Sequence, residues 1–183
     1  MISNFFKIEI NGHQFEKAYL IYIVKLTSFN PNYGEYYYIG QTGDRNHFTA
    51  RPAFRRLAGH FSDQGNSTEN QIYKAIVSGI LNKKYSKGTP FDPDIKSSVT
   101  EFLINSTIEM FVYPIKAFSE SDSKEDHETN RKNVEKIEAE LIYHFIETYC
   151  KERVLNKKTP KIVPPREVST QEIIDHFNNQ VRR

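Results

Sequence analysis

The amino-acid sequence predicts a mixed α/β (α+β) fold in which a small central antiparallel β-sheet is flanked by helices. Two runs of aromatic and β-branched residues, 20–24 and 36–39, are typical of strands, and the turn-forming segment 28–34 separates them. Further along the chain, apolar residues recur at helical spacing in several segments. A chain of 183 residues with 38% hydrophobic residues is long enough for one such domain with its own core.

The two runs are expected to pair as an antiparallel hairpin with a long loop. Strands over 19–26 and 35–40 would bring Tyr22 near Tyr38. Gly40 closes the second strand at a point where the backbone bends or comes close to another group. Before the hairpin, apolar and polar residues alternate over 6–10 and lead into Asn11-Gly12, which predicts an edge strand entering a type I′ turn.

A short helix is expected after the polar loop 41–51, because Pro52 suits a first helical turn. Arg56 and His60, four residues apart, would project together from one side and present a guanidinium and an imidazole to an anion. An exposed helix face without a role is the alternative for this pair. The opposite, core-facing side would carry the apolar residues Phe54, Leu57, Ala58 and Phe61.

The middle of the chain alternates between helical and extended patterns. An amphipathic helix is predicted over 70–81, a loop over 84–94, and 94–106 allows a further short helix. Residues 107–118 are expected to form a strand in which Pro114 implies an edge position or a bulge.

The polar, acidic segment 119–130 is expected to be a mobile loop, and a long helix is predicted over 128–149. Glu138 falls inside the apolar stripe of this helix, whereas Glu135, Glu140 and Glu147 fall outside it. An ionised carboxylate among core side chains costs roughly several kcal/mol unless it is compensated. A divalent cation is one compensator for Glu138, and a salt bridge to an arginine is the alternative.

Beyond this helix, prolines mark an extended basic linker, and Ser169 to Glu172 is predicted to be a capping box that opens a short last helix. Asn156 lies between the long helix and this linker, where a turn or helix C-cap is its simplest role. Cys150 is the single cysteine, which excludes an internal disulfide and a zinc finger, and it is expected to be a buried helix residue.

Charge and hydropathy bound the class of protein. No run is apolar enough to cross a bilayer and the N-terminal residues lack the order of a signal peptide, so we expect a cytoplasmic protein without a membrane partner. Residues 41–88 hold eight Lys/Arg against three Asp/Glu and 151–183 hold eight against four, whereas 119–140 hold four against eight. Two basic regions flanking an acidic one are typical of a face that meets phosphate and holds a cation beside it. Ordinary solvated charge is the alternative.

Taken in order, these residues resemble the GIY-YIG nuclease superfamily. Leu20-Ile21-Tyr22 looks like the first motif, with Leu in place of the usual Gly, and Tyr38-Ile39-Gly40 is the second motif as it stands. Arg56 and His60 are similar to the arginine and histidine that follow, with Arg55 as the competing arginine. Glu138-Ala139-Glu140-Leu141-Ile142 and Val154-Leu155-Asn156-Lys157 look like the family's glutamate and asparagine segments.

The resemblance implies a nuclease domain over 1–156 with insertions at about 63–106 and 119–130, followed by a C-terminal basic linker and short helix over 157–183. It implies that Glu138 holds a single Mg²⁺ or Mn²⁺ and that Arg56 contacts the nonbridging phosphate oxygens. The implied catalytic set is Tyr22, Tyr38, Arg56, His60, Glu138 and Asn156. The residues expected to contact nucleic acid are Gly40, Thr42, Arg55, Lys157 and Lys158.

In this set Tyr22 would act as general base or orient the water, Tyr38 would position the phosphate or water, and His60 would hydrogen-bond Tyr22 or the phosphate. Which of the three takes the proton is left open. We therefore expect a metal-dependent DNA endonuclease, with a restriction-type enzyme as the subclass. The alternatives are an inactive nucleic-acid-binding domain that keeps this fold and a purely structural α/β protein. The oligomeric state, a dimer included, and the DNA specificity are left open.

Overall fold

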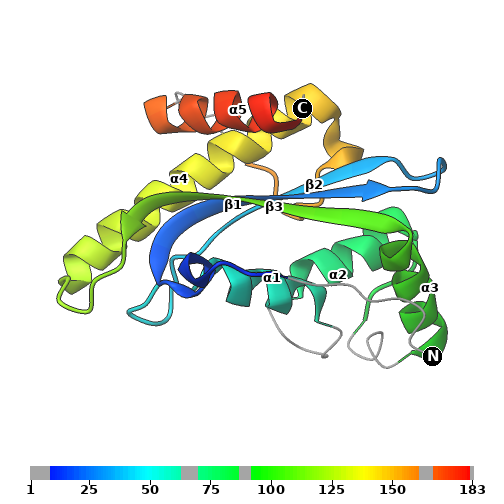
Figure 1. Ribbon diagram of the computed structural model, residues 1–183, viewed down its shortest axis with the longest axis horizontal. Coiled ribbons are helices and arrows are strands. Elements are labelled where there is room, and N and C mark those ends of the chain that lie inside the picture. Colours follow the sequence, from blue (N-terminus) through cyan, green and yellow to red (C-terminus); the bar gives the residue numbers. More distant parts are fainter. Residues whose placement is uncertain (1–8, 63–69, 87–91, 161–166, 182–183) are drawn as a thin grey trace.

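The computed structural model describes residues 9–62, 70–86, 92–160 and 167–181 (Figure 1). Strands β1 (Ala18–Ser28), β2 (Glu35–Gln41) and β3 (Ser106–Ala117) form an antiparallel sheet in the order β2-β1-β3. In Figure 1, α4 and α5 cover one face of this sheet, while α1, α2 and α3 lie on the other face. The predicted α+β class, with a small central antiparallel sheet between helices, is confirmed.

The helices among the described residues include both long and short elements. Two helices lie on the first face, α4 (Lys124–Tyr149) and α5 (Val168–Val181), and neither they nor the other described helices are long and apolar enough to cross a membrane. On the second face and in the connections are η1 (Gly12–Phe15), α1 (Ala53–Phe61), α2 (Gln71–Ala75), the π-helical η2 (Ile76–Ile80), α3 (Pro93–Ile104) and η4 (Lys151–Arg153).

The central strand β1 divides its side chains between two cores. Tyr19, Ile21 and Ile23 pack with α4 and α5, whereas Leu20, Tyr22 and Val24 pack with the helices of the other face. Successive side chains of a strand point to opposite faces, so a strand covered on both sides must be apolar throughout. This explains why β1 reads as an almost continuous apolar run.

The hairpin and the edge strand follow the expectations from sequence. β1 and β2 pair antiparallel, with Tyr22 opposite Gly40. β3 lies at the far edge of the sheet, and its register shifts where Pro114 pairs with Leu20. Pro114 therefore occupies both an edge strand and a bulge, the two positions that tolerate a residue without an N–H.

Segment 119–130 was expected to be a loop, and that prediction is wrong for its second half. α4 begins at Lys124, and Ser123 opens it with a capping box in which the Ser123 side chain accepts from the Asp126 N–H. The first turns of α4 are mostly exposed and therefore carry no apolar stripe. Capping residues, rather than hydrophobic spacing, were the signal for this helix start.

Glu140 was expected outside the buried stripe of α4, and it is instead only 4% exposed. The cause is α5, which packs across α4 and places its own N-terminus over this carboxylate. Glu140 Oε2 accepts from the Glu167 N–H at 2.9 Å and from the Thr170 hydroxyl. A carboxylate at a helix N-terminus satisfies open N–H groups and complements the helix dipole. The predicted capping box is therefore wrong, because α5 already begins at Val168.

Two further expectations need correction, and one of them lies partly outside the described residues. Asn11 accepts from the His13 N–H and caps η1, so Asn11-Gly12 does not form a hairpin turn, and residues 6–8 lie outside the description. Cys150 is exposed and ends α4 with a positive φ of 66°.

The predicted helix over 70–81 is present but becomes π-helical from Ile76. The ambiguous segment 94–106 is mostly helical, and the loop predicted over 84–94 is described only in part.

Candidate active site

Tyr22 is held in place by the glycine opposite it on β2. A Cβ at Gly40 would sit 2.6 Å from Cε2 of Tyr22 and closer still to the hydroxyl end. Glycine is therefore required here because the Tyr22 ring lies against the backbone of β2. The close approach expected at Gly40 is present, and the group that approaches is Tyr22.

Two side chains of helix α1, His60 and Arg56, contact the Tyr22 hydroxyl. His60 Nε2 lies 2.6 Å from Tyr22 Oη, and Arg56 Nε donates to the same oxygen at 3.4 Å. Arg55 is exposed. The geometry thus brings Arg56, rather than the competing Arg55, to the tyrosine.

The orientation of α1 differs from the one expected. His60 is fully buried while Ala58 is exposed, so the helix turns its polar pair toward the sheet. Leu57 and Phe61 pack against the core as the apolar spacing predicted, but His60 is buried with them instead of projecting from the opposite side of the helix. The hydrogen bonds of Arg56 and His60 to Tyr22 compensate for bringing polar groups inside.

Tyr38 completes an aromatic cluster beside Tyr22. The rings of Tyr38 and Tyr22 are stacked with centroids 6.4 Å apart, and the Tyr38 and His60 centroids are 4.7 Å apart. Burial raises the pKa of Tyr22 to about 12, although the Arg56 guanidinium lowers it, and burial also raises the pKa of Tyr38 well above its usual value. Both phenols are therefore protonated near neutral pH in this state.

Glu138 approaches the same cluster from α4 on the other face. Burial and the nearby Glu135 raise the pKa of Glu138 to about 7, while Arg56 and Arg45 lower it. In return, the Glu138 charge raises the pKa of Tyr22 and of Tyr38. Glu138, Arg56 and the two phenols therefore lie in one electrostatic neighbourhood, as the sequence predicted.

The alternative role of Glu138, a salt bridge to arginine, is not seen among the described residues. Two arginines pair with Glu135 instead, since Arg45 Nε and Arg131 Nη1 each lie 2.7 Å from Glu135 Oε1, and Arg56 donates to Tyr22. Glu138 is partly buried and makes no hydrogen bond or ion pair within the part of the chain that the structure describes. A carboxylate in this condition is a candidate ligand for a cation.

The donor set fits a magnesium-type ion better than a zinc-type ion. Within the described residues there is no cluster of three or more His, Cys, Asp or Glu side chains that could hold a metal. Zinc takes three or four protein ligands, whereas Mg²⁺ keeps several waters and is held by one or two carboxylates together with substrate phosphate. Glu138, a single carboxylate, is closer to the second pattern than to the first.

A basic groove of about 480 Å³ adjoins this cluster, and we call it the catalytic groove. It contains three predicted residues, Thr42, Arg56 and Lys158, and two arginines that were not assigned to the site from sequence, Arg45 and Arg51. Arg51 pairs with Asp44 at 2.7 Å. The missed arginines lie in or at the end of the loop 41–51, whose basic content was visible in the sequence but was interpreted only as a connection. The full lining is residues 41–46 with Arg51, Arg56, Gln71 and Lys158.

Thr42 and Asn156 are buried and hold the scaffold of the site. Thr42 Oγ1 accepts from the Leu20 N–H at 3.0 Å and donates to the Ala18 carbonyl. Asn156 accepts from the Ile39 N–H at 3.0 Å and donates to the Ile39 carbonyl at 2.7 Å. Asn156 thereby satisfies the outer edge of β2 and positions the strand that carries Tyr38 and Gly40. Its geometry is that of a positioning residue rather than a turn or helix cap.

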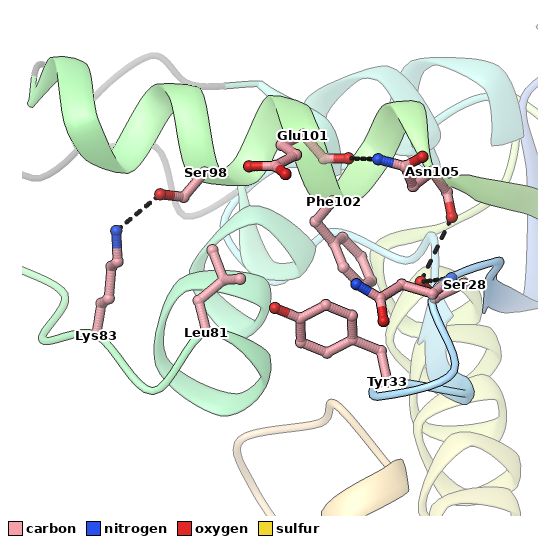
Figure 2. A pocket seen from close by; sticks show the side chains of 9 residues that line it. Ser28, Tyr33, Leu81, Lys83, Ser98, Glu101, Phe102 and Asn105 are labelled. Carbon is pink, nitrogen blue, oxygen red and sulfur yellow. Dashed lines mark hydrogen bonds between the residues drawn. The ribbon is translucent and has the colours of Figure 1, made fainter.

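Lys157 and Lys158 are both exposed, but they line different hollows. Lys158 belongs to the catalytic groove, whereas Lys157 lines a neighbouring cavity next to α2. A third, smaller cavity of about 250 Å³ lies between α3 and the β1–β2 loop, with Phe102, Tyr33 and the Lys83–Ser98 hydrogen bond in its wall (Figure 2). The third cavity contains none of the predicted site residues.

Comparison with known proteins gives no match to a family model, to a curated protein or to a solved structure. Function is therefore inferred from the geometry and chemistry of the site.

Proposed function

We propose that this chain is a metal-dependent DNA endonuclease of the GIY-YIG type that hydrolyses phosphodiester bonds. The observation that carries the proposal is the proximity of Tyr22, Arg56 and His60 to a carboxylate, Glu138, whose side chain forms no hydrogen bond or salt bridge with the described residues. These groups come from β1, α1 and α4, and the basic catalytic groove lies beside them.

Arg56 supplies the charge that phosphodiester hydrolysis needs most. Negative charge grows on the nonbridging oxygens in the transition state, and a planar guanidinium matches their geometry with two parallel donors. Arg56 already donates to Tyr22 through Nε and lines the catalytic groove. It can therefore link the phosphate to the tyrosine.

Tyr22 and His60 form a hydrogen-bonded pair that can take up one proton. The 2.6 Å separation allows the phenol to give its proton to Nε2 as it accepts another from the attacking water. Burial raises the pKa of Tyr22 to about 12, so a free Tyr22 phenolate is unfavourable near neutral pH. Transfer of the phenol proton to His60 avoids the need for such a phenolate. Tyr38 stacks beside them and fixes the position of the Tyr22 ring.

Glu138 would hold Mg²⁺ or Mn²⁺, which would supply Lewis-acid stabilisation of the charge on the phosphate and the leaving oxygen. Glu138 is suited to this because burial makes its charge unfavourable until a cation compensates it.

DNA is the proposed substrate class because the groove beside these groups is lined by Arg45, Arg51, Arg56 and Lys158. A restriction-type enzyme remains the proposed subclass. The segments 63–106 and 119–130 enlarge the nuclease domain, and such insertions are suited to recognising a target sequence.

A second candidate is a nucleic-acid-binding domain without catalytic activity. Burial favours it, because Tyr22 is fully buried and Tyr38 is 8% exposed, so neither phenol is open to solvent in this state. Catalysis requires that substrate or a small shift of α1 gives water access to Tyr22.

The first test is cleavage of supercoiled plasmid in the presence of Mg²⁺. Glu138→Gln and Arg56→Ala are each expected to slow cleavage by about 100-fold or more, the usual loss when one transition-state donor or metal contact is removed. Glu147→Gln, an exposed position on the same helix, is the matched control and should cut like the unmodified protein.

A second readout is independent of cutting. Millimolar Mg²⁺ or Mn²⁺ should raise the Tm of the unmodified protein and of Glu147→Gln but not of Glu138→Gln, because only the folded carboxylate site binds the cation. Cleavage that survives both Glu138→Gln and Arg56→Ala would contradict the proposal. Tight DNA binding without cutting in any divalent metal would favour the second candidate.

A further inference from the structure

The cavity that contains Lys157 is larger than the catalytic groove and adjoins it at Gln71, and we call it the α2 cavity. Its volume is about 770 Å³. Gln71 lines both hollows, and the consecutive residues Lys157 and Lys158 line one each. The wall of the α2 cavity consists of Gln71, Lys74, Ala75, Ser78, Gly79, Tyr85, Lys151, Glu152, Val154, Leu155 and Lys157.

The charge of the α2 cavity favours an anionic ligand. Lys74, Lys151 and Lys157 line it against a single acid, Glu152. Burial lowers the pKa of Lys74, and the charge of Lys157 lowers it further, which indicates that these two ammonium groups repel each other across the cavity. A phosphate placed between them would relieve that repulsion.

The position of Lys74 is set by the protein. Its Nζ lies over the Tyr85 ring, 5.5 Å from the centroid, and the Tyr85 hydroxyl accepts from the buried Asn70 side chain at 3.2 Å. A cation over an aromatic ring is attracted by the ring quadrupole, so the ring holds the ammonium at the cavity wall. Lys151 is fixed too, since its Nζ donates to the Asn156 carbonyl at 2.7 Å.

Part of the cavity wall consists of small residues. Ala75, Ser78 and Gly79 form it from α2 and the π-helical η2, and a Cβ added at Gly79 would meet nothing within 4 Å. Small side chains allow a polymer backbone to approach the helix closely. A volume of about 770 Å³ also exceeds the space that one isolated anion fills and suits a chain of linked groups.

We propose that the α2 cavity is a phosphate-binding extension of the catalytic groove that holds the sugar-phosphate backbone of DNA next to the nucleotide being cut. Lys74 and Lys157 bind the phosphates, and Tyr85 and Lys151 position the cavity. Naming DNA as the ligand rests on the proposed function, whereas the anion-binding character rests on the cavity itself.

The salt dependence of DNA binding tests this inference. A fluorescently labelled duplex is titrated with protein in EDTA, so that no cutting occurs, over a series of NaCl concentrations. Each phosphate contact contributes about 0.9 to the slope of log K against log salt. Lys74→Ala and Lys157→Ala should each reduce the slope by about one, and the double variant by about two. Lys116→Ala, an exposed lysine on β3 at the opposite edge of the sheet, should leave the slope unchanged.

Each outcome separates this inference from the proposed nuclease. If Lys74→Ala and Lys157→Ala reduce the slope but the unmodified protein does not cut DNA, the phosphate site is supported and the nuclease proposal fails. If the protein cuts but neither lysine changes the slope, the inference fails alone. A protein that binds no duplex at low salt overturns both. Equal Tm values for all variants confirm that the slopes report contacts and not folding.

Discussion

The pKa of Glu138 lies above the ordinary carboxyl range. Burial raises its pKa to about 7, so the folded state binds the proton more tightly than the unfolded chain does. Stability conferred by the protonated form is therefore present at acidic pH and is lost as pH rises from the ordinary carboxyl range through about 7.

Glu138→Gln should remove this pH dependence. Without divalent metal, the variant is expected to be more stable than the unmodified protein at pH 8, with the difference vanishing near pH 4, because glutamine carries no charge to bury. Urea unfolding at the two pH values measures this. Glu147→Gln should show no such divergence, and equal stabilities at pH 8 would show that the Glu138 carboxylate is well solvated.

Gly40 offers a second test at the scale of one residue. Gly40→Ala places a Cβ against the Tyr22 ring and should destabilise the fold by about 1–3 kcal/mol, as other overpacking substitutions do. Gly79→Ala is the matched control, since its Cβ meets nothing within 4 Å and alanine favours a helix, and it should be neutral or stabilise by up to about 1 kcal/mol. Chemical denaturation that ranks the two variants in the opposite order would contradict the packing role of Gly40.

At the scale of elements, the outer edge of β2 depends on the segment that follows α4. Leu155 N–H donates to the Tyr37 carbonyl at 2.7 Å, and the Asn156 side chain pairs with both backbone groups of Ile39. This segment therefore serves as a partial fourth strand that ends before Gly40.

Asn156→Ala should cost about 1–3 kcal/mol of stability, because it leaves the Ile39 N–H and C=O without their partner. Asn133→Ala, on an exposed turn of α4, should change the stability by less than about 0.5 kcal/mol. Thermal unfolding of the two variants is the measurement. A loss of cutting by Asn156→Ala with unchanged stability would instead assign Asn156 a direct part in the chemistry.

The elements that the sequence predicted best are those with a strong local pattern. The β1–β2 hairpin, β3 with its proline and the body of α4 all follow from periodicity and turn residues. The start of α4 and the burial of Glu140 could not be found in this way, because the first turns of α4 are solvated and Glu140 is covered by a distant helix, α5. Such tertiary effects override local spacing.

At the scale of the whole molecule, the ordered set of site residues was easier to predict than their orientation. Tyr22, Arg56, His60 and Glu138 share one neighbourhood as the motif spacing implied. The side of α1 that faces the sheet was predicted incorrectly because Arg56 and His60, both polar, point toward Tyr22. Lys157 was expected to contact nucleic acid, but its partner Lys74 was missed because the two lysines lie far apart in sequence and only the fold brings them to one cavity.

Glu138 belongs to α4, which covers one face of the sheet, whereas Arg56 and His60 belong to α1, which lies on the other face (Figure 1). During synthesis, Glu138 leaves the ribosome after Arg56 and His60. A partly synthesised chain therefore lacks the carboxylate of the candidate site. The groups of the candidate site therefore come together only after both helical layers have packed on the sheet, so the site forms late, as a product of the completed fold.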